Sequence, residues 1–332
     1  MGKKIDFIIT WVDGSDPKWK QEKNFFRKNK NSNCNNTIRY RNWDTLKFWF
    51  RGVEKFAPWV NKIHFITWGH LPKWLNVDHP KINIVNHKDF IPNKYLPTFN
   101  SVPIELNFHR IKGLADKFVY FNDDMFIIDK VKKSDFFKNG NPCDSLIFTV
   151  IPPSKDQFSK TLFNNMSIIN KYFNKTKVIK NNIYKIFNIK YSKHLLRSFL
   201  ALPWTELPGI YNPHLQVSYK KSTFNKIWGI ESQVLSNACK EKFRNYDDIN
   251  HFLLRYWRLM SGDFFPSKIK GKYFYVSKDI SLIKKAIIKQ KYKTICINDE
   301  KIDNSKFSDI KNDIHFSFNK ILPIKSSFEI KS

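Results

Sequence analysis

The chain has 332 residues, of which 42% are hydrophobic and 16% aromatic, so it can bury a large core in one or two domains. This composition excludes an intrinsically disordered chain. The formal net charge of +29 favours a polyanionic partner, such as nucleic acid, an acidic membrane face, a nucleotide or a phosphate-bearing polymer. A general bias toward Lys, Asn and Ile is the alternative explanation for much of that excess.

The N-terminus and the cysteines indicate a soluble cytoplasmic protein. The first apolar run is interrupted by Asp6 and ends at Asp13, so it is too short for a signal peptide or a membrane span. No later segment reaches about 18 uninterrupted apolar residues, although the charge would allow peripheral contact with an anionic leaflet. Unpaired, buried thiols in a reducing compartment are expected, because no metal-type spacing links the cysteines. These are Cys34, Cys143, Cys239 and Cys296.

The first part of the chain alternates predicted strands with predicted helices. "KIDFIITWV" (4–12), "KIHFITWG" (62–69), "KINIVNH" (81–87) and "KFVYFNDD" (117–124) are strand-like, and the first ends at the turn sequence "DGSDP". Apolar residues at helical spacing predict a helix within residues 42–60 that Pro58 ends, and Pro103 and Gly113 bound another over 102–113. This alternation predicts an α/β fold with a mainly parallel sheet.

The second part of the chain is read as mostly helical. Residues 152–203 have apolar residues at helical intervals among Lys and Asn, which indicates a helical insertion. "NYDDINHFLLRYWRLMSG" (245–262) predicts a helix with Asp247 and Asp248 in its first turn. The last 60 or so residues alternate short β-like runs with Lys-rich turns. We therefore divide the chain into an α/β core (1–151), the insertion (152–205), a second part of the core (206–265) and a basic C-terminal extension (266–332).

Two acidic pairs follow predicted strands, at the edge where ligands bind in open α/β sheets. Asp13 and Asp16 follow the first strand, and Asp123 and Asp124 follow the strand at 117–121. Paired carboxylates suit a hard divalent cation such as Mg²⁺. For the first pair, ordinary turn chemistry is the favoured explanation. For the second, a metal site is favoured, because adjacent acids repel each other unless a cation or solvent relieves them.

A row of polar residues precedes the second pair. Ser101, Glu105 and His109 are spaced four residues apart, which would place them on one helical face as a substrate-facing edge. A solvated helix face explains the same spacing equally well. His214 in a loop and Arg244 before a helix N-terminus, where an anion is favoured, stay unassigned on spacing alone.

The amino-acid sequence of four blocks resembles that of the Stealth family of sugar-phosphate transferases. These blocks are "IDFIITWVDGSDPKW", a long run from "APWVNKIHFITWG" to "FVYFNDDMFI", "YNPHLQVSYKKS" and "KFRNYDDINHFLLRYWRLMSG". Together they extend over residues 5 to 262, and residues 152–203 and the C-terminal 60 residues lie outside them. The resemblance implies a glycosyltransferase-A-like, Rossmann-type sheet with helices on both faces, plus the helical insertion.

The resemblance also implies an activity: transfer of hexose-1-phosphate from a UDP-N-acetylhexosamine donor to an acceptor hydroxyl, with Mg²⁺ or Mn²⁺ and release of UMP. We expect the acceptor to be a growing, anionic capsular or surface phosphoglycan. A conventional glycosyltransferase that releases UDP is the first alternative. A basic nucleic-acid-binding protein is the second, although no RRM, KH or helix-turn-helix signature supports it and we expect no nucleic-acid partner. The oligomeric state is not predicted.

Roles for individual residues are implied by the same resemblance. Asp123 and Asp124 belong to the metal and diphosphate site, and Arg244 steadies the phosphates. His214 is the candidate base, and His109, which the resemblance places in the sugar pocket, is the alternative. The turn Trp68-Gly69-His70 replaces the family's usual Asp- or Asn-Gly-Gln. The implied substrate-binding residues are Trp11, Asp13, Gly14, Asp16, Asn100, Ser101, Glu105, Arg110 and Asn250.

Overall fold

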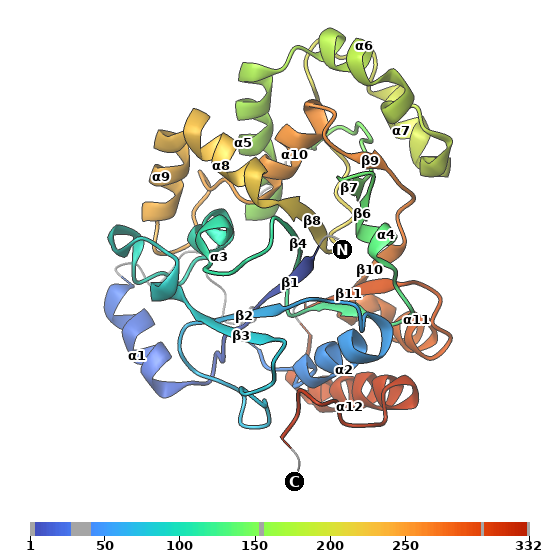
Figure 1. The fold of residues 1–332 in the computed structure, drawn as a ribbon. Coiled ribbons are helices and arrows are strands. Elements are labelled where there is room, and N and C mark those ends of the chain that lie inside the picture. Colours follow the sequence, from blue (N-terminus) through green and yellow to red (C-terminus); the bar gives the residue numbers. More distant parts are fainter. Residues whose placement is uncertain (1–3, 28–40, 153–155, 300–301, 331–332) are drawn as a thin grey trace.

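A mainly parallel sheet forms the centre of the molecule (Figure 1). The computed structural model describes residues 4–27, 41–152, 156–299 and 302–330. In this part of the chain the central sheet has the order β3-β2-β1-β4-β8. The first four strands in this order run parallel, and β8 runs antiparallel to β4. The strands are β1 (Ile5–Thr10), β2 (Ile63–Thr67), β3 (Ile82–Asn86), β4 (Lys117–Phe121) and β8 (Val217–Lys220).

Helices cover both faces of this sheet, so the predicted α/β arrangement is confirmed. Successive side chains of a strand point to opposite faces, and both faces are apolar here. Phe7 and Ile9 of β1 join a buried cluster that includes residues of α2, α11 and α12, whereas Ile8 joins a cluster that includes residues of α3, α8 and α10. The bounds are α2 (Leu46–Phe56), α3 (Ser101–Leu106), α8 (Lys221–Ile230), α10 (Phe252–Met260), α11 (Val276–Ile288) and α12 (Asn304–Ile321).

The C-terminal residues are packed into this fold. The strands β10 (Gly271–Tyr275) and β11 (Thr294–Asn298) pair in parallel, and β11 pairs antiparallel with β5 (Met125–Ile127), which follows β4. The prediction of short strands and turns missed the helices α11 and α12 in this region. Ile283 and Ile287 in α11, and Ile314 and Phe318 in α12, are buried at helical spacing among lysines.

Helix α2 approaches β5 very closely at Gly52. A Cβ atom built on Gly52 would lie 2.6 Å from the backbone oxygen of Ile127. A side chain there would therefore push the helix away from the strand. Glycine at this position therefore allows α2 to pack closely on β5, the strand that follows Asp124.

Residues 156–200 are helical, as the sequence predicts. The segment contains α5 (Gln157–Tyr172), α6 (Lys175–Ile186), the 3-10 helix η6 (Ile189–His194) and α7 (Leu195–Leu200). Asp156 and Asn174 cap α5 and α6, because their side-chain oxygens accept hydrogen bonds from Ser159 N and Lys177 N. Helix α5 packs on α10, and α6 and α7 lie along one rim of the molecule, away from the central sheet (Figure 1).

Two predicted helices are shorter than expected. The helix expected over 102–113 ends at Leu106 and is followed by η5 (Phe108–Arg110). The side chain of Asn107 donates to Pro103 O over 2.8 Å, which offers the chain an alternative to continuing the helix. Helix α10 begins at Phe252, not at Asp247, because the Asp248 carboxylate accepts a hydrogen bond from Asn245 N in a turn before the helix.

The remaining elements surround this core. A small sheet has the order β6-β7-β9. Within the described ranges, no helix combines the length and the hydropathy needed to cross a bilayer. The other bounds are α1 (Pro17–Phe26), η3 (His87–Asp89), η4 (Asn93–Tyr95), α4 (Lys133–Phe136), β6 (Phe137–Lys138), β7 (Asn141–Asp144), α9 (Ser232–Lys240) and β9 (Phe265–Pro266).

The thiols of the described cysteines are unpaired. Cys239 and Cys296 are buried as expected, but Cys143 is half-buried, because it lies in the short strand β7 near the surface. The prediction for Cys34 falls outside the described residues.

Candidate functional site

A cavity of about 860 Å³ lies at the carboxyl ends of β1 and β4. Its walls come from segments that are far apart in the sequence: the ends of these strands, the start of α3, the start of α5, residues 211–217 and residues 244–252. The C-terminal strands β10 and β11 complete it. The cavity is thus placed where ligands of open α/β sheets bind. Predicted site residues on its walls are Trp11, Asn100, Ser101, Glu105, Asp123, Asp124, His214, Arg244 and Asn250.

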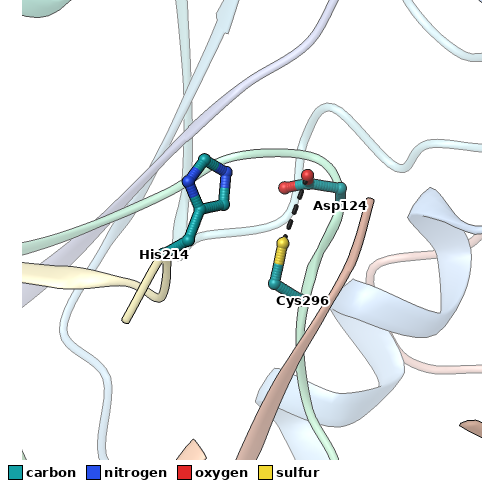
Figure 2. A group of neighbouring side chains, drawn as sticks. All are labelled: Asp124, His214 and Cys296. Carbon is teal, nitrogen blue, oxygen red and sulfur yellow. Dashed lines mark hydrogen bonds between the residues drawn. The ribbon is translucent and has the colours of Figure 1, made fainter. Parts of the chain in front are cut away.

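Asp124 and His214, which line the cavity, lie close to the buried Cys296 (Figure 2). Each offers one possible ligand atom, and these atoms lie within 4.8 Å of one another. The Cys296 thiol donates to Asp124 Oδ2 over 3.3 Å. Asp124 follows β4, His214 lies in the loop before β8, and Cys296 is in β11. This group could therefore hold a metal ion.

The Asp124 carboxylate is poorly compensated. Its Oδ1 is buried and accepts no hydrogen bond from another described residue. Burial and the neighbouring Asp123 carboxylate raise the pKa of Asp124 to about 7. Burial and the Asp124 carboxylate also raise the pKa of the Cys296 thiol, which therefore stays protonated and can donate. A buried acid with an unused oxygen is the arrangement that a bound cation would relieve.

His214 is held by a tight turn with an aromatic surround. Its backbone has φ of 50°, in the left-handed region, and its N–H donates to Asn212 Oδ1 over 2.9 Å. The imidazole contacts Phe158 of α5 and Tyr273 of β10, with ring centroids 5.4 and 5.0 Å away. Burial lowers the pKa of His214 to about 4. The ring is thus neutral near pH 7, the form that can accept a proton.

Hydrogen-bonded polar residues form another part of the cavity wall. Arg244 donates from its guanidinium to Ser101 Oγ over 3.1 Å. The hydroxyl of Tyr120 lies 3.3 Å from Glu105 Oε1 and 2.5 Å from Asn122 Oδ1. Burial raises the pKa of Glu105 to about 7, although hydrogen bonds from Ser101 and Tyr120 oppose this shift. This part of the wall therefore presents to the cavity the cationic guanidinium of Arg244 and the carboxyl group of Glu105, whose pKa is near 7.

Asn100 and Asn250 line the cavity, but their side chains have structural partners. Asn100 Oδ1 caps α3 by accepting from Val102 N over 3.2 Å. Asn250 Oδ1 accepts from Asn165 Nδ2 of α5 over 2.8 Å, which joins α5 to the start of α10. These two residues thus fix the elements that shape the cavity.

The turn after β1 lies outside the cavity walls, apart from Trp11 and Val12. Asp13 Oδ1 accepts from Ser15 N and Ser15 Oγ, over 2.8 and 2.6 Å, and Asp16 caps α1 by accepting from Trp19 N over 2.8 Å. His70, from the unusual turn after β2, accepts from Asp13 N over 2.6 Å. Asp13, Gly14 and Asp16 therefore build the turn, as the turn explanation expects.

The prediction that His109 shares one face with Glu105 is wrong. Because α3 stops at Leu106, His109 lies outside the cavity, against Phe224 and Trp228. Arg110 also lies outside it: its Nε donates to Asn107 Oδ1 over 2.9 Å, and its guanidinium covers Trp228.

Two cavity residues, Asp248 and Tyr120, and the neighbouring Cys296 were not predicted as site residues. Asp248, expected in a helix, is a buried acid whose pKa burial raises to about 7, and its Oδ2 accepts from Gln157 Nε2 of α5 over 3.1 Å. Tyr120 was predicted only as part of a buried strand, although its hydroxyl group, in an otherwise apolar run, could have indicated a site residue. Cys296 had no signal, because its place depends on the pairing of β11 with β5.

Conserved regions of one family match the first part of the chain. The model described as Stealth protein CR1, conserved region 1, matches residues 3–31. The model described as Stealth protein CR2, conserved region 2, matches residues 39–144, which include β2, β3 and β4 and the acidic pair after β4.

Curated relatives match along almost the whole length. A capsular polysaccharide phosphotransferase WcwK of Streptococcus pneumoniae is 49% identical over 99% of this chain and 99% of its own. The exopolysaccharide phosphotransferase cps2G of Lactiplantibacillus plantarum is 37% identical over 98% of this chain and 96% of its own. Among solved structures, the galactosyltransferase LgtC in complex with donor and acceptor sugar analogs aligns with 92% of this chain and 95% of its own, at 10% identity and a TM-score of 0.40.

Proposed function

Because this chain belongs to the Stealth family of phosphotransferases, we propose that its cavity binds a UDP-N-acetylhexosamine and transfers the hexosamine-1-phosphate. The acceptor in this proposal is a hydroxyl group of a growing capsular or surface polysaccharide, and UMP is released. Relatives named as capsular and exopolysaccharide phosphotransferases, similar over nearly their whole length, support this choice of acceptor.

One observation carries the proposal: Asp124 and His214 both line the cavity with possible ligand atoms within 4.8 Å of each other, and Asp124 has a buried oxygen without a partner among the described residues. A carboxylate that a cation would stabilise and an imidazole that is neutral near pH 7 thus lie in one cavity at the end of β4. This combination suits phosphoryl transfer. The reaction depends on positioning the reactants and neutralising charge more than on covalent catalysis.

The residues present fit a divalent cation, and we propose Mg²⁺ or Mn²⁺. Asp124 would hold it through the oxygen that lacks a partner, and Asp123, whose side chain is exposed in the cavity, would share it. Such a cation, when bound, neutralises charge on the diphosphate of the donor. Cys296 is a poor ligand for these hard ions, and its protonated thiol is better suited to orient Asp124 by hydrogen bonding.

The roles of the other residues follow from their places. His214 accepts the proton of the acceptor hydroxyl while the hydroxyl oxygen forms a bond to the β-phosphorus of the donor. The bond from this phosphorus to the bridging oxygen breaks, and UMP leaves with that oxygen. The bond between the sugar and its phosphate stays intact, so the anomeric configuration is kept. Arg244 offsets the charge on the phosphate oxygens, and its contact with Ser101 orients it.

The charge of the chain supports an anionic acceptor. A net charge of +29 raises the local concentration of a polymer with one phosphate in each repeat. The same positive charge would attract the protein to the anionic lipids of the cytoplasmic face of the membrane, where we propose that it acts.

The test uses donor labelled with ³²P at the β-phosphorus. Purified protein is incubated with UDP-N-acetylglucosamine, UDP-N-acetylgalactosamine or UDP-glucose, with Mg²⁺ or Mn²⁺ and a phosphoglycan primer. We expect label in the polymer, UMP as the released nucleotide, and a phosphodiester signal in ³¹P NMR of unlabelled product. Unlabelled polymer together with labelled UDP would identify a conventional glycosyltransferase instead and overturn the proposal.

A further inference from the structure

The rim formed by α6, η6 and α7 exposes large apolar side chains. Tyr184 and Ile189 are 88% and 86% exposed, and further apolar residues of α7 and of the chain after it are exposed as well. We call this surface the α6–α7 face. Scattered single apolar residues are normal on a protein surface, but a group of this kind marks an interaction site. The face comprises Tyr184, Ile189, Leu196, Phe199, Leu200 and Trp204.

These side chains are not needed to attach the segment to the core. Helix α6 buries Val178, Asn182 and Ile186 instead, and the buried Ser198 of α7 accepts a hydrogen bond at its Oγ from Phe148 N over 3.0 Å. The rings of Phe187 and Phe199 lie 4.9 Å apart, which joins the end of α6 to α7. The face is therefore built on fixed helices, with its apolar residues turned outward.

Along the segment that carries the face the charge has one sign, and the exposed Glu206 lies just beyond it. Residues 157–205 include eight Lys and one Arg, and neither Asp nor Glu. Lys177, Lys180, Lys190, Lys193 and Arg197 are exposed on α6, η6 and α7. An average surface mixes both signs. Outward apolar residues between cations are the pattern of segments that lie in a membrane interface, with the cations at the headgroups.

We propose that the α6–α7 face docks on an anionic phospholipid bilayer, with its aromatic and aliphatic side chains among the acyl chains. Charge complementarity selects this occupant, because a segment without acidic residues matches a surface of phosphate headgroups. The position of the face agrees with this role. Helix α5 begins in the wall of the cavity and runs to α6 (Figure 1), so docking holds the cavity about one helix length from the membrane surface. The proposal does not depend on the reaction that the cavity catalyses.

Vesicle sedimentation tests the proposal. The protein is mixed with two kinds of vesicle. One contains phosphatidylcholine alone, and in the other about two in five lipids are phosphatidylglycerol. We expect binding to the anionic vesicles that weakens as NaCl is raised, because salt screens the attraction between lysines and headgroups. The double variant Tyr184→Ser with Ile189→Ser, and the double variant Lys190→Glu with Lys193→Glu, should each weaken binding about tenfold or more.

The matched control is Ile324→Ser, which removes a side chain that is 81% exposed but lies outside the face. It should bind vesicles as the unchanged protein does. Circular dichroism and the melting temperature check that all variants are folded. Equal loss in the control, equal binding to both kinds of vesicle, or no binding to either would overturn the proposal. A concentration-dependent dimer that Ile189→Ser abolishes, without vesicle binding, would show that a second copy covers the face.

Discussion

Two acidic pairs follow neighbouring strands of one sheet, and the structure treats them differently. β1 and β4 pair in parallel, so Asp13 and Asp16 on one side and Asp123 and Asp124 on the other emerge at the same edge. In the turn after β1, the carboxylates accept hydrogen bonds from Ser15 and Trp19. After β4, Asp124 keeps a buried oxygen without a partner among the described residues.

The difference teaches which acids are available for a ligand. A carboxylate that caps a helix or closes a turn has used its lone pairs locally, and its contribution is to stability. A carboxylate that is desolvated beside another acid, with an oxygen to spare, has an unfavourable environment that a cation would improve. In the sequence, the two pairs differ only in that Asp123 and Asp124 are adjacent whereas Asp13 and Asp16 are not. In the structure, their hydrogen bonds distinguish them clearly.

The largest effect is expected at Asp124. Asp124→Asn removes the charge that would hold the cation, so kcat/KM for sugar-phosphate transfer should fall by about 10³-fold or more. The matched variant Asp13→Asn should change kcat/KM by less than about tenfold, since Asp13 serves the turn. Initial rates at saturating Mg²⁺ measure both. Equal losses in the two variants would remove the distinction between the pairs.

A second large effect is expected at His214. His214→Ala should lower kcat by about 10²- to 10⁴-fold, the range for loss of a general base. His109→Ala, which alters a ring packed on Phe224 and Trp228, should lower the melting temperature while kcat stays within about threefold. Single-turnover rates and thermal melts check this pair. A normal rate in His214→Ala would rule out His214 as the base.

A third acid, Asp144, extends the comparison because its side chain is mostly covered, paired with two arginines and outside the cavity walls. It accepts from Arg255 over 2.8 and 2.9 Å and from Arg258 over 2.5 Å. Burial raises the pKa of Asp144, but the two guanidinium groups outweigh burial and hold it below its usual 3.8. Asp144→Asn should therefore lower the free energy of unfolding by about 3–5 kcal/mol.

The pH dependence of this effect has a defined sign. Because the folded-state pKa of Asp144 is below the unfolded one, its stabilisation is complete above about pH 4 and is lost as pH falls through the folded pKa. Urea unfolding of both proteins between pH 7 and pH 2 measures this. The stability difference between wild type and Asp144→Asn should shrink toward the acid end, and a constant difference would contradict the assignment.

The smallest effect is expected at Asp16. Asp16→Ala removes the N-cap of α1 and should lower the free energy of unfolding by about 1 kcal/mol. Asp16→Asn keeps an accepting oxygen and should lose much less. Urea titrations of the two variants compare them, and a loss of activity larger than the loss of stability would point to a direct contact with substrate.

The sequence predicts the central sheet well for a physical reason. Strands buried on both faces must be nearly continuous apolar runs, and the runs at 4–12, 62–69, 81–87 and 117–124 contain β1 to β4 in chain order. The acidic pair after β4 could also be predicted as a site from the sequence. Two adjacent carboxylates repel each other, so their presence after a buried strand indicates a ligand that relieves the repulsion.

The rest depends on contacts that periodicity does not contain. Asn107 ends α3 through its own side chain, so the row through Glu105 and His109 is broken. Cys296 reaches Asp124, 172 residues earlier in the chain, only through the pairing of β11 with β5. Arg244 and His214 were assigned by resemblance alone. Their places in the cavity wall required the folded chain.

Binding of Mn²⁺ tests the central claim most directly, because its EPR signal reports the ion without turnover. Free Mn²⁺ is titrated against wild type, Asp124→Asn and Asp13→Asn in the presence of UDP-N-acetylglucosamine. The account predicts one bound Mn²⁺ per chain, about 10- to 100-fold weaker binding in Asp124→Asn, and unchanged binding in Asp13→Asn. Equal binding by Asp124→Asn and wild type, or loss of the ion in Asp13→Asn, would contradict it.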